Sequence, residues 1–138
     1  MIEFARTHII GRAAGHSAVK AAAYRSGTKQ KDEWNGLTAD YGFRAAEVAH
    51  SEILLPDGAP VELADRNTLW NEIQFAEDKS TRRSTAQLAK DHIIALPREL
   101  SLNQQIELRG TSRKRLLIRV LPLISMCICT VKTTHTLI

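Results

Sequence analysis

The sequence has few of the residues that staple a small fold. Its two cysteines, Cys127 and Cys129, stand one residue apart, which excludes a disulfide framework and an all-cysteine zinc site. This cysteine usage fits a reducing cytoplasm. The chain of 138 residues is nevertheless long enough for one domain with a hydrophobic core, and its 43% hydrophobic content is typical of a globular protein.

The sequence also lacks a membrane span and a leader. Its most apolar stretch, residues 116–131, is interrupted by Arg119 and Pro122 and falls short of the ~20 residues that cross a bilayer. The first residues, Met-Ile-Glu-Phe-Ala-Arg, contain no apolar core of a secretory signal. We therefore expect a cytoplasmic protein without a membrane partner.

Acidic residues are absent from the last 29 positions. Residues 110–138 hold five Lys and Arg and no Asp or Glu, a net charge of +5, whereas residues 1–109 hold 14 against 15, a net charge of −1. The formal charge of +4 therefore belongs to the tail. This asymmetry divides the chain into a first part at 1–109 and a basic, apolar tail at 110–138.

The first part alternates between strand and helix patterns. Residues 2–10 have the period of a strand, and Ser17 caps a helix through about Arg25 that Gly27 ends in the left-handed conformation. The buried stripe of this helix is predicted to comprise Val19, Ala22 and Ala23. The polar residues 28–50 are predicted to form a long loop.

Further strands and helices are predicted beyond that loop. Residues 50–55 and 92–96 are predicted strands, and Asp65 opens a helix. The core face of that helix is predicted to comprise Leu69, Ile73 and Ala76, with Trp70 beside it. Capping-box patterns, Ser84 with Gln87 and Ser101 with Gln104, predict two more helical segments. This order of elements predicts an α+β fold, in which an antiparallel sheet carries helices packed on one face.

Tyr24 lies at the exposed edge of the first predicted helix, four residues after Lys20 and next to Arg25. The pattern alone is typical of a half-buried aromatic residue whose hydroxyl group meets water. The run GRAAGHSAVKAAAYRSG at residues 11–27 is much more specific, because it resembles the N-terminal signature of the MobA/MobL relaxases, the nicking enzymes of plasmid mobilisation. Segments that agree with this family in order and spacing follow at 50–60, 69–77, 86–89, 95–100 and 105–108. The resemblance covers about residues 1–109.

This resemblance implies a fold and a reaction. The fold is the ferredoxin-like sheet of the His-hydrophobe-His (HUH) endonucleases, incomplete here at its C-terminal side. In the family a tyrosine, here Tyr24, attacks single-stranded DNA at the plasmid transfer origin and becomes joined to a 5′ end. A phenol is a weak nucleophile at neutral pH and needs a nearby cation, and Lys20 is predicted to supply part of that charge. The further partners implied are accessory mobilisation and coupling proteins.

Cations and aromatic residues around Tyr24 are candidates for DNA contacts. The predicted backbone contacts are Arg12, Arg25, Lys29 and Lys31. For each of them a solvated surface charge is the alternative. Trp34 and Tyr41 are predicted either to stack on unpaired bases or to anchor the loop that carries them.

The family's metal ligands are missing from this sequence. The resemblance implies a three-histidine site for a divalent metal, Mg or Mn, with two ligands in a His-x-His pair. This chain has no such pair, and the histidines of its first part, His8, His16, His50 and His92, are scattered. As written, the chain is predicted to have no metal ligand set, with Asp91 as a possible acidic contributor near the site.

The tail offers an explanation that rests on the genetic code. Reading the codons of residues 126–138 two bases late permits Val-x-x-His-Gly-Lys-Asp-Asn-Pro-His-Ala-His, which resembles the family's metal-binding segment. Together with the loss of acidic residues, this predicts a frameshift near Arg109. The alternative is a genuine divergent C-terminus, with an apolar strand at 116–124 that supports the sheet.

The sequence therefore predicts a relaxase that nicks transfer-origin DNA through Tyr24 and is inactive or impaired as written, since it lacks the stabilisation that a bound metal ion gives the transition state. The alternative is a non-catalytic DNA-binding remnant or accessory protein of plasmid mobilisation, whose binding depends on salt but not on chelators. A third hypothesis is a degraded gene product without a cooperative unfolding transition.

Overall fold

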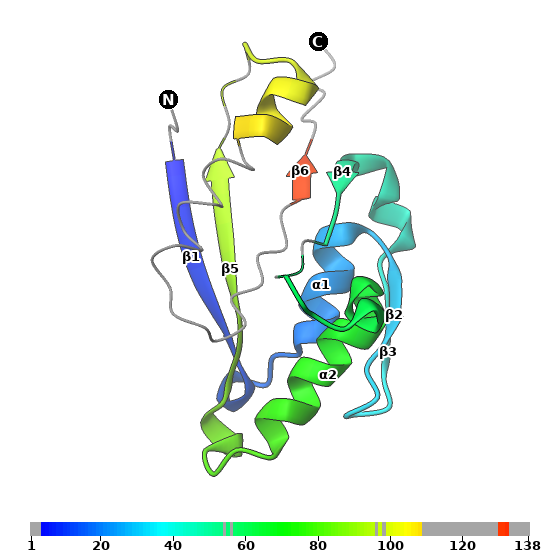
Figure 1. Ribbon diagram of the computed structural model, residues 1–138, viewed down its shortest axis with the longest axis vertical. Coiled ribbons are helices and arrows are strands. Elements are labelled where there is room, and N and C mark those ends of the chain that lie inside the picture. Colours follow the sequence, from blue (N-terminus) through cyan, green and yellow to red (C-terminus); the bar gives the residue numbers. More distant parts are fainter. Residues whose placement is uncertain are drawn as a thin grey trace.

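The computed structural model describes residues 4–53, 55, 57–95, 97, 99–108 and 130–132 (Figure 1). In chain order its strands and α-helices are β1 (Phe4–Gly11), α1 (Ala18–Ser26), β2 (Lys29–Lys31), β3 (Thr38–Asp40), β4 (Val48–Ser51), α2 (Arg66–Asp78), β5 (Gln87–Ala95) and β6 (Thr130–Lys132). A further helix covers residues 102–108. The described strand pairs, β1 with β5, β2 with β3 and β4 with β6, are antiparallel, so the predicted α+β class is confirmed.

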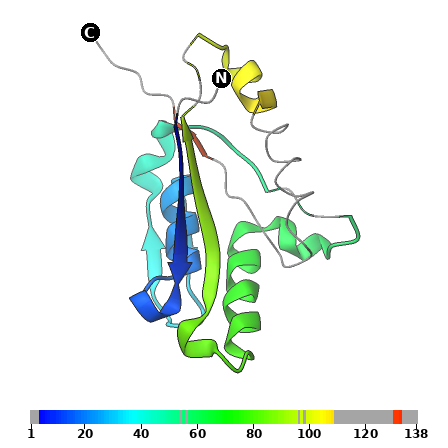
Figure 2. The same ribbon diagram turned by 90° about the vertical axis from the view of Figure 1, so that its left-hand side faces the viewer.

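β1 and β5 form the longest ladder, in which His8 lies opposite Asp91. Both α1 and α2 lie on the same side of this ladder (Figures 1 and 2), which confirms the prediction of helices on one face. Because side chains alternate along a strand, Asp91 points to the face toward α1, where it binds Arg25. The opposite face carries Thr7 and His92, whose side chains share a hydrogen bond of 2.8 Å.

α1 begins and ends where its capping residues predict. The Ser17 side chain accepts a hydrogen bond from the Lys20 backbone N–H at 3.1 Å, and Gly27 follows the helix with a φ angle of 64°. The predicted buried residues Val19, Ala22 and Ala23 are all fully buried. Small side chains on this face let α1 pack closely against the core residues of α2 and β5.

α2 supplies the largest buried side chains. Asp65 caps this helix by accepting a hydrogen bond from the Thr68 backbone N–H at 2.8 Å, which lowers the pKa of Asp65. Leu69, Trp70 and Ile73 enter the core as predicted. Ala76 is exposed, contrary to the prediction, because the buried stripe continues through Gln74, whose side chain turns toward Asp32.

The segment at 28–50 is structured, so the prediction of a long loop is wrong. It contains the β2–β3 hairpin, a 3-10 helix η2 (Gly42–Glu47) and the start of β4. The hairpin is held by a polar contact with both helical regions, since the buried carboxylate of Asp32 accepts hydrogen bonds from Ser17 and Gln74. These partners are distant in the sequence, so no local pattern reveals the hairpin.

The two capping-box patterns have different outcomes. Ser101 and Gln104 exchange hydrogen bonds of 2.9 and 3.3 Å and start the helix at 102–108, as predicted. Ser84 instead lies in a 3-10 helix, η4 (Arg83–Thr85), and Gln87 begins β5, so the helix predicted there is wrong. Ala86 and Leu88 are buried in the core, which favours the extended chain and starts the strand earlier than predicted.

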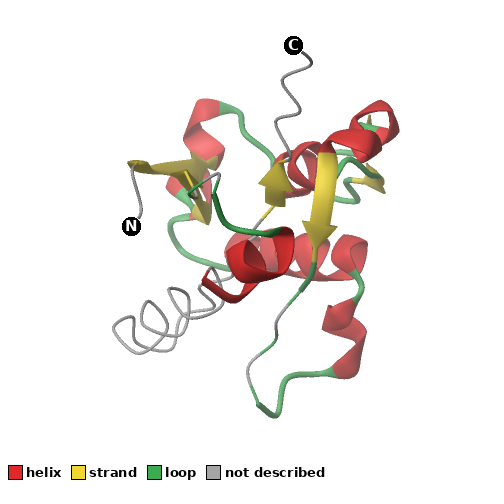
Figure 3. Ribbon diagram, turned by 90° about the horizontal axis from the view of Figure 1, so that it is seen from above, coloured by secondary structure: helices red, strands yellow, loops and turns green. Residues whose placement is uncertain are grey.

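The strand predicted at 50–55 lies instead at Val48–Ser51, where β4 pairs with β6 of the tail. The apolar strand predicted at 116–124 lies outside the described residues, as does most of the segment at 126–138. None of the helices in the described part of the chain has the length and apolar content needed to cross a membrane. The segment between β4 and α2 contains the 3-10 helix η3 (Val61–Ala64), whose Leu63 packs against the core. The described loop that precedes η3 projects outward (Figure 3).

Candidate functional site

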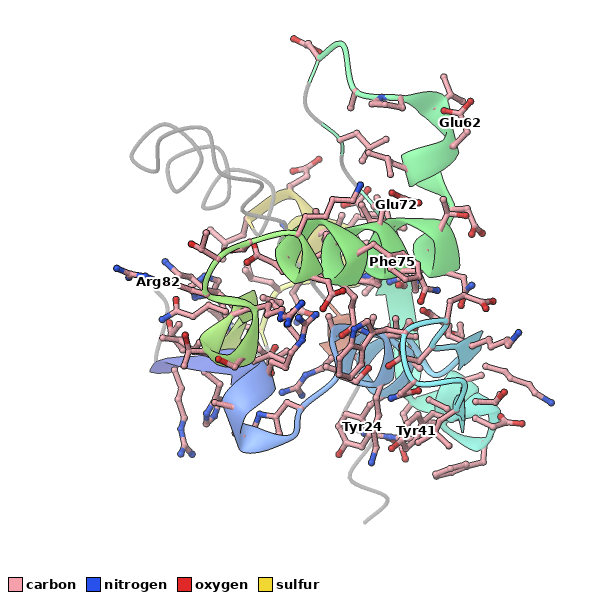
Figure 4. All side chains as sticks on the ribbon, turned by 90° about the horizontal axis from the view of Figure 1, so that it is seen from below. Tyr24, Tyr41, Glu62, Glu72, Phe75 and Arg82 are labelled. Atoms are coloured by element: carbon pink, nitrogen blue, oxygen red, sulfur yellow. The ribbon has the colours of Figure 1, made fainter. Side chains whose placement is uncertain are left out.

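Tyr24 lies in the last turns of α1, on the side of the helix that faces solvent. Its neighbours Ala22 and Ala23 are fully buried, and this fixes the tyrosine at the surface, where 41% of it is exposed. Figure 4 shows Tyr24 beside Tyr41, both far from Glu62 on the opposite side of the molecule. The predicted exposure of Tyr24 is therefore confirmed.

Three aromatic rings follow one another at this surface. The rings of Tyr24 and Tyr41 meet edge to face with their centroids 5.3 Å apart, and the centroid of Phe43 lies 6.1 Å from that of Tyr41. Phe43 is 80% exposed to solvent. Tyr41 and Phe43 come from the start of η2, so this 3-10 helix places two aromatic residues next to the candidate nucleophile. We call Tyr24, Tyr41 and Phe43 the aromatic row.

Arg44 lies beneath this row and was not among the residues that the sequence singled out. Its guanidinium carbon is 3.7 Å from the centroid of the Tyr24 ring. Its Nε and Nη2 groups donate hydrogen bonds to Oε2 of Glu47, at 3.1 and 2.9 Å. The Nη1 group is buried and has no hydrogen-bond partner among the described residues. The hydrogen bond with Glu47, supported by Tyr24, raises the pKa of Arg44 against the opposing effect of burial.

Gly27 brings η2 to this position. The residue has a left-handed backbone, and a Cβ atom placed on it would lie 2.8 Å from the Ala45 backbone nitrogen. Only glycine therefore allows the end of α1 and the backbone of η2 to come so close. Tyr41 is held in addition by its backbone N–H, which donates to the carbonyl oxygen of Thr28 at 3.1 Å.

Arg25 and Asp91, which were predicted in separate roles, bind each other. Nε of Arg25 donates to Oδ2 of Asp91 at 3.1 Å, and the Nη2 group binds the same oxygen. The guanidinium carbon of Arg25 also lies 5.7 Å from the centroid of the Tyr24 ring. This ion pair joins α1 to β5 and places a second cation close to the aromatic row. A role of Arg25 in DNA contact, or of Asp91 near a metal, stays a prediction.

The predicted lysines lie on exposed surfaces. Lys29 is 3.7 Å from Asp40 across the β2–β3 hairpin, and Lys31 is 3.2 Å from Glu33. Such exposed ion pairs contribute little to stability, so both lysines stay available for a polyanion. Lys20 is exposed on α1, one turn before Tyr24. The cations whose guanidinium groups lie over the Tyr24 ring are Arg44 and Arg25.

Arg12 occupies a different setting from the other predicted DNA contacts. Its side chain is only 9% exposed and forms an ion pair of 3.3 Å with Asp78. It also donates to the carbonyl oxygens of Gln74 and Arg83. Trp34 packs on its guanidinium, 4.6 Å away, and Trp34 Nε1 donates to Asp78 at 3.4 Å. Of the two alternatives for Trp34, these contacts support the anchoring role.

We expect Arg12→Met to lower the free energy of unfolding by about 1–2 kcal/mol, since the carbonyl oxygens of Gln74 and Arg83 lose a charged donor. Lys29→Met is the matched control, because the ion pair of Lys29 is exposed, and a change near zero is expected. Urea unfolding of both variants measures the difference. A fully stable Arg12→Met variant with reduced affinity for DNA would instead assign Arg12 to the DNA contacts.

The described residues do not fit the metal site that the resemblance implies. No group of three or more His, Cys, Asp or Glu side chains in this part of the chain is arranged to hold a metal ion. His92 shares a hydrogen bond with Thr7, and Asp91 is paired with Arg25.

Sequence reasoning missed Phe43, Arg44 and Glu47 because the segment that carries them was predicted to be a loop. The segment has a usable signal, since Tyr41, Phe43 and Arg44 concentrate two aromatic residues and a cation in a stretch of four residues. No helical or strand spacing relates these residues to Tyr24, however. These residues lie near Tyr24 because the backbone of η2 lies close to Gly27.

Comparisons with known proteins connect this geometry to a family. The sequence profile of the MobA/MobL family matches residues 16–113. The chain is 38% identical over 108 residues to a probable mobilization protein MobA of Bifidobacterium longum and 42% identical over 96 residues to mobilization protein MobL of Acidithiobacillus ferridurans. It is 39% identical over 110 residues to conjugal transfer protein TraA of Rhizobium radiobacter.

These alignments cover 78%, 70% and 72% of this chain but only 18%, 23% and 10% of the three relatives. The chain therefore spans less than a quarter of the length of the curated relatives it matches. A solved structure from work on the molecular basis of vancomycin resistance transfer in Staphylococcus aureus superposes with a TM-score of 0.74 at 30% identity. That superposition covers 83% of this chain and 56% of the other, and it supports the α+β fold class.

Proposed function

The chain belongs to the MobA/MobL family, and on that premise we propose that it is the nucleophile-bearing part of a relaxase. Tyr24 is the proposed nucleophile, and single-stranded DNA at a plasmid transfer origin is the proposed substrate. The observation that carries this proposal is the exposed side chain of Tyr24 with two arginines close to its ring, within the segment that matches the family.

The proposed step is a transesterification. The phenolic oxygen of Tyr24 forms a bond to the phosphorus atom of a phosphodiester, and the bond between that phosphorus and the 3′ oxygen breaks. The phenolic proton passes to solvent, and the leaving 3′ oxygen takes up a proton. One phosphoester replaces another, so the 5′ end stays linked to the protein in an activated form that can later be rejoined.

The arginines supply the electrostatics of this step. Negative charge develops on the phenolic oxygen as its proton leaves, and the phosphate carries negative charge throughout. The guanidinium carbons of Arg44 and Arg25 lie 3.7 and 5.7 Å from the ring centroid, where their positive charge would stabilise both groups. Their carboxylate partners, Glu47 and Asp91, hold the guanidinium groups in position, so no reorganisation is needed during the reaction.

Membership of the family also indicates dependence on a metal, and we propose Mg or Mn. The described residues do not provide three ligands for it. A bound cation commonly supplies several kcal/mol of transition-state stabilisation. We therefore propose that the chain of 138 residues nicks DNA weakly or not at all.

Tyr24→Phe tests the assignment of the nucleophile. We expect the wild-type chain, incubated with Mg²⁺ or Mn²⁺ and single-stranded oligonucleotides that tile the mobilisation region, to form a covalent adduct slowly and in low yield. Peptide mass spectrometry is expected to map the adduct to Tyr24. The adduct should be absent in Tyr24→Phe, because phenylalanine has no oxygen to attack phosphorus, and present in the matched control Tyr41→Phe.

Two outcomes would contradict parts of this proposal. An adduct that persists in Tyr24→Phe would place the nucleophile elsewhere. A rapid adduct that chelators abolish in the wild-type chain would show that its metal site is complete and would refute the proposed impairment.

The setting of this reaction belongs to the same proposal. We place it in the cytoplasm, on single-stranded origin DNA, with accessory mobilisation and coupling proteins as partners. The names of the relatives, which are mobilisation and conjugal transfer proteins, support this setting.

A second candidate function is DNA binding without cleavage. The absence of a His-x-His pair from the sequence is the observation that favours it. Under this alternative, affinity for single-stranded DNA falls steeply with salt but is unchanged by chelators and by Tyr24→Phe. The adduct assay separates the two candidates, because a remnant of this kind forms no covalent product.

A further inference from the structure

We infer that Tyr41 and Phe43 form a stacking platform for an unpaired base next to the phosphate that Tyr24 would attack. The ligand class is single-stranded nucleic acid. This inference rests on the proposed function for its biological setting, but base stacking at this surface can be measured without any chemistry at Tyr24.

The exposure of Phe43 is the first observation. The side chain is 80% exposed although phenylalanine carries no polar group that gains from contact with water. Single exposed apolar residues are common on proteins, so exposure alone identifies no site. The other strongly exposed apolar residues, Leu37 and Val61, lie on different elements and take part in none of the described ring contacts.

The second observation is that Phe43 continues a row of rings. Its centroid lies 6.1 Å from that of Tyr41, which in turn lies 5.3 Å from that of Tyr24. A base stacked on Phe43 or Tyr41 would have its own backbone close to the phenol of Tyr24. Aromatic side chains that accept bases in this way are sequence-tolerant, because every base has a flat π face.

The third observation is the guanidinium group of Arg44, which lies against the Tyr24 ring. The side chain is more than nine-tenths buried, with an exposure of 8%. Nε and Nη2 are occupied by Glu47, while Nη1 has no hydrogen-bond partner in the described chain. Guanidinium groups select phosphate oxygens as acceptors. The residue after Phe43 thus places a buried guanidinium group behind the ring row, where its positive charge would attract the phosphate of a nucleotide stacked on Phe43.

The platform is also held rigidly before any ligand arrives. The backbone of η2 approaches Gly27 closely, and the ion pair of Arg44 with Glu47 spans the same 3-10 helix. A pre-formed ring surface loses little conformational freedom when a base stacks on it. Cations near the row, among them the exposed Lys20 and Lys29, favour a polyanion over an apolar protein partner.

The experiment uses a dT12 oligonucleotide with one 2-aminopurine, whose fluorescence falls when the base stacks on an aromatic ring. We expect the full chain to quench this probe on binding. In Phe43→Leu the quenching should be lost and the affinity should fall about 5- to 20-fold, since one stacked base is removed. The salt dependence of the remaining binding should be unchanged, because leucine removes no charge.

Phe75→Leu is the matched control. Phe75 is a partly exposed phenylalanine of α2, and Figure 4 shows it well apart from Tyr24 and Tyr41. This variant should quench and bind like the wild type. Circular dichroism and urea unfolding verify that both variants fold, which is expected because the Phe43 ring contributes little buried surface.

The inference is overturned if the wild-type chain does not quench the probe, if Phe43→Leu quenches as strongly as the wild type, or if Phe75→Leu loses as much. Tyr24→Phe keeps its ring and is expected to quench normally. Loss of quenching in Phe43→Leu therefore supports the platform even where no adduct forms at Tyr24, and failure of the nicking proposal remains distinguishable from failure of this one.

Discussion

Gly27→Ala is expected to lower the free energy of unfolding by about 3 kcal/mol, a large effect for the addition of one methyl group. Two penalties combine in this substitution. The residue has a φ angle of +64°, which costs alanine about 1 kcal/mol or more. Its new Cβ atom would also lie 2.8 to 2.9 Å from backbone atoms of Arg44 and Ala45, which cannot rotate out of the way as a side chain would.

Gly27→Ala should also disturb the candidate site. The backbone that must move belongs to η2, which carries Phe43 and Arg44 next to Tyr24. We therefore expect Gly27→Ala to reduce 2-aminopurine quenching at concentrations of denaturant where the variant is still folded.

Gly58→Ala separates the two penalties. Gly58 also has a positive φ angle, +81°, but a Cβ atom there would meet nothing within 4 Å. Its loss of stability should be only about 1 kcal/mol. If urea unfolding gives the two variants equal decreases in the free energy of unfolding, the close approach of η2 to Gly27 adds nothing to the cost of the substitution.

α1 could be predicted from the sequence almost residue by residue, because its signals are local. Ser17 accepts from a backbone N–H three residues ahead, and Gly27 ends the helix through its own conformation. Tyr24 follows from the same helix, since burial of Ala22 and Ala23 leaves it at the surface. Its proposed role as a nucleophile came from the family resemblance and not from the pattern.

The region at 28–50 could not be predicted in this way. The two strands of its hairpin have three residues each, and the one buried residue in them, Gln30, is polar, so no apolar alternation marks them. Asp32 is held by Gln74, and Asn71 bonds to the backbone of Lys31. The stacking of Arg44 on Tyr24 is a contact of the same kind, because it depends on distant residues that the fold brings together.

The capping-box pattern occurs twice in the sequence, and tertiary packing decides which copy forms a helix. Ser84 with Gln87 and Ser101 with Gln104 carry the same capping signal, but only the second pair opens a helix. After Ser84 the chain buries Leu88 against the core, and this burial outweighs a cap. Capping residues therefore decide the structure only where tertiary packing makes no stronger demand.

Restoring the reading frame is expected to have the largest effect on activity. We propose that shifting the gene by two bases near codon 109 replaces the basic tail with a segment containing three histidines, and that the resulting chain forms the Tyr24 adduct at least about a hundredfold faster in Mg²⁺ or Mn²⁺. The described residues already place Arg44 and Arg25 close to the Tyr24 ring, but they include no three-ligand group. The corrected chain would add the missing histidines and leave residues 1–108 unchanged in sequence, although it would replace β6, which pairs with β4.

The nucleotide sequence from codon 100 onward is the first measurement. An open shifted frame that encodes the three histidines supports the proposal, and the corrected protein should then lose its gain with a chelator and in Tyr24→Phe. A stop codon in that frame, or a corrected chain no faster than the original, would refute the proposal. The aromatic row and its arginines would then serve binding alone, because they can stack a base and contact a phosphate without a metal ion.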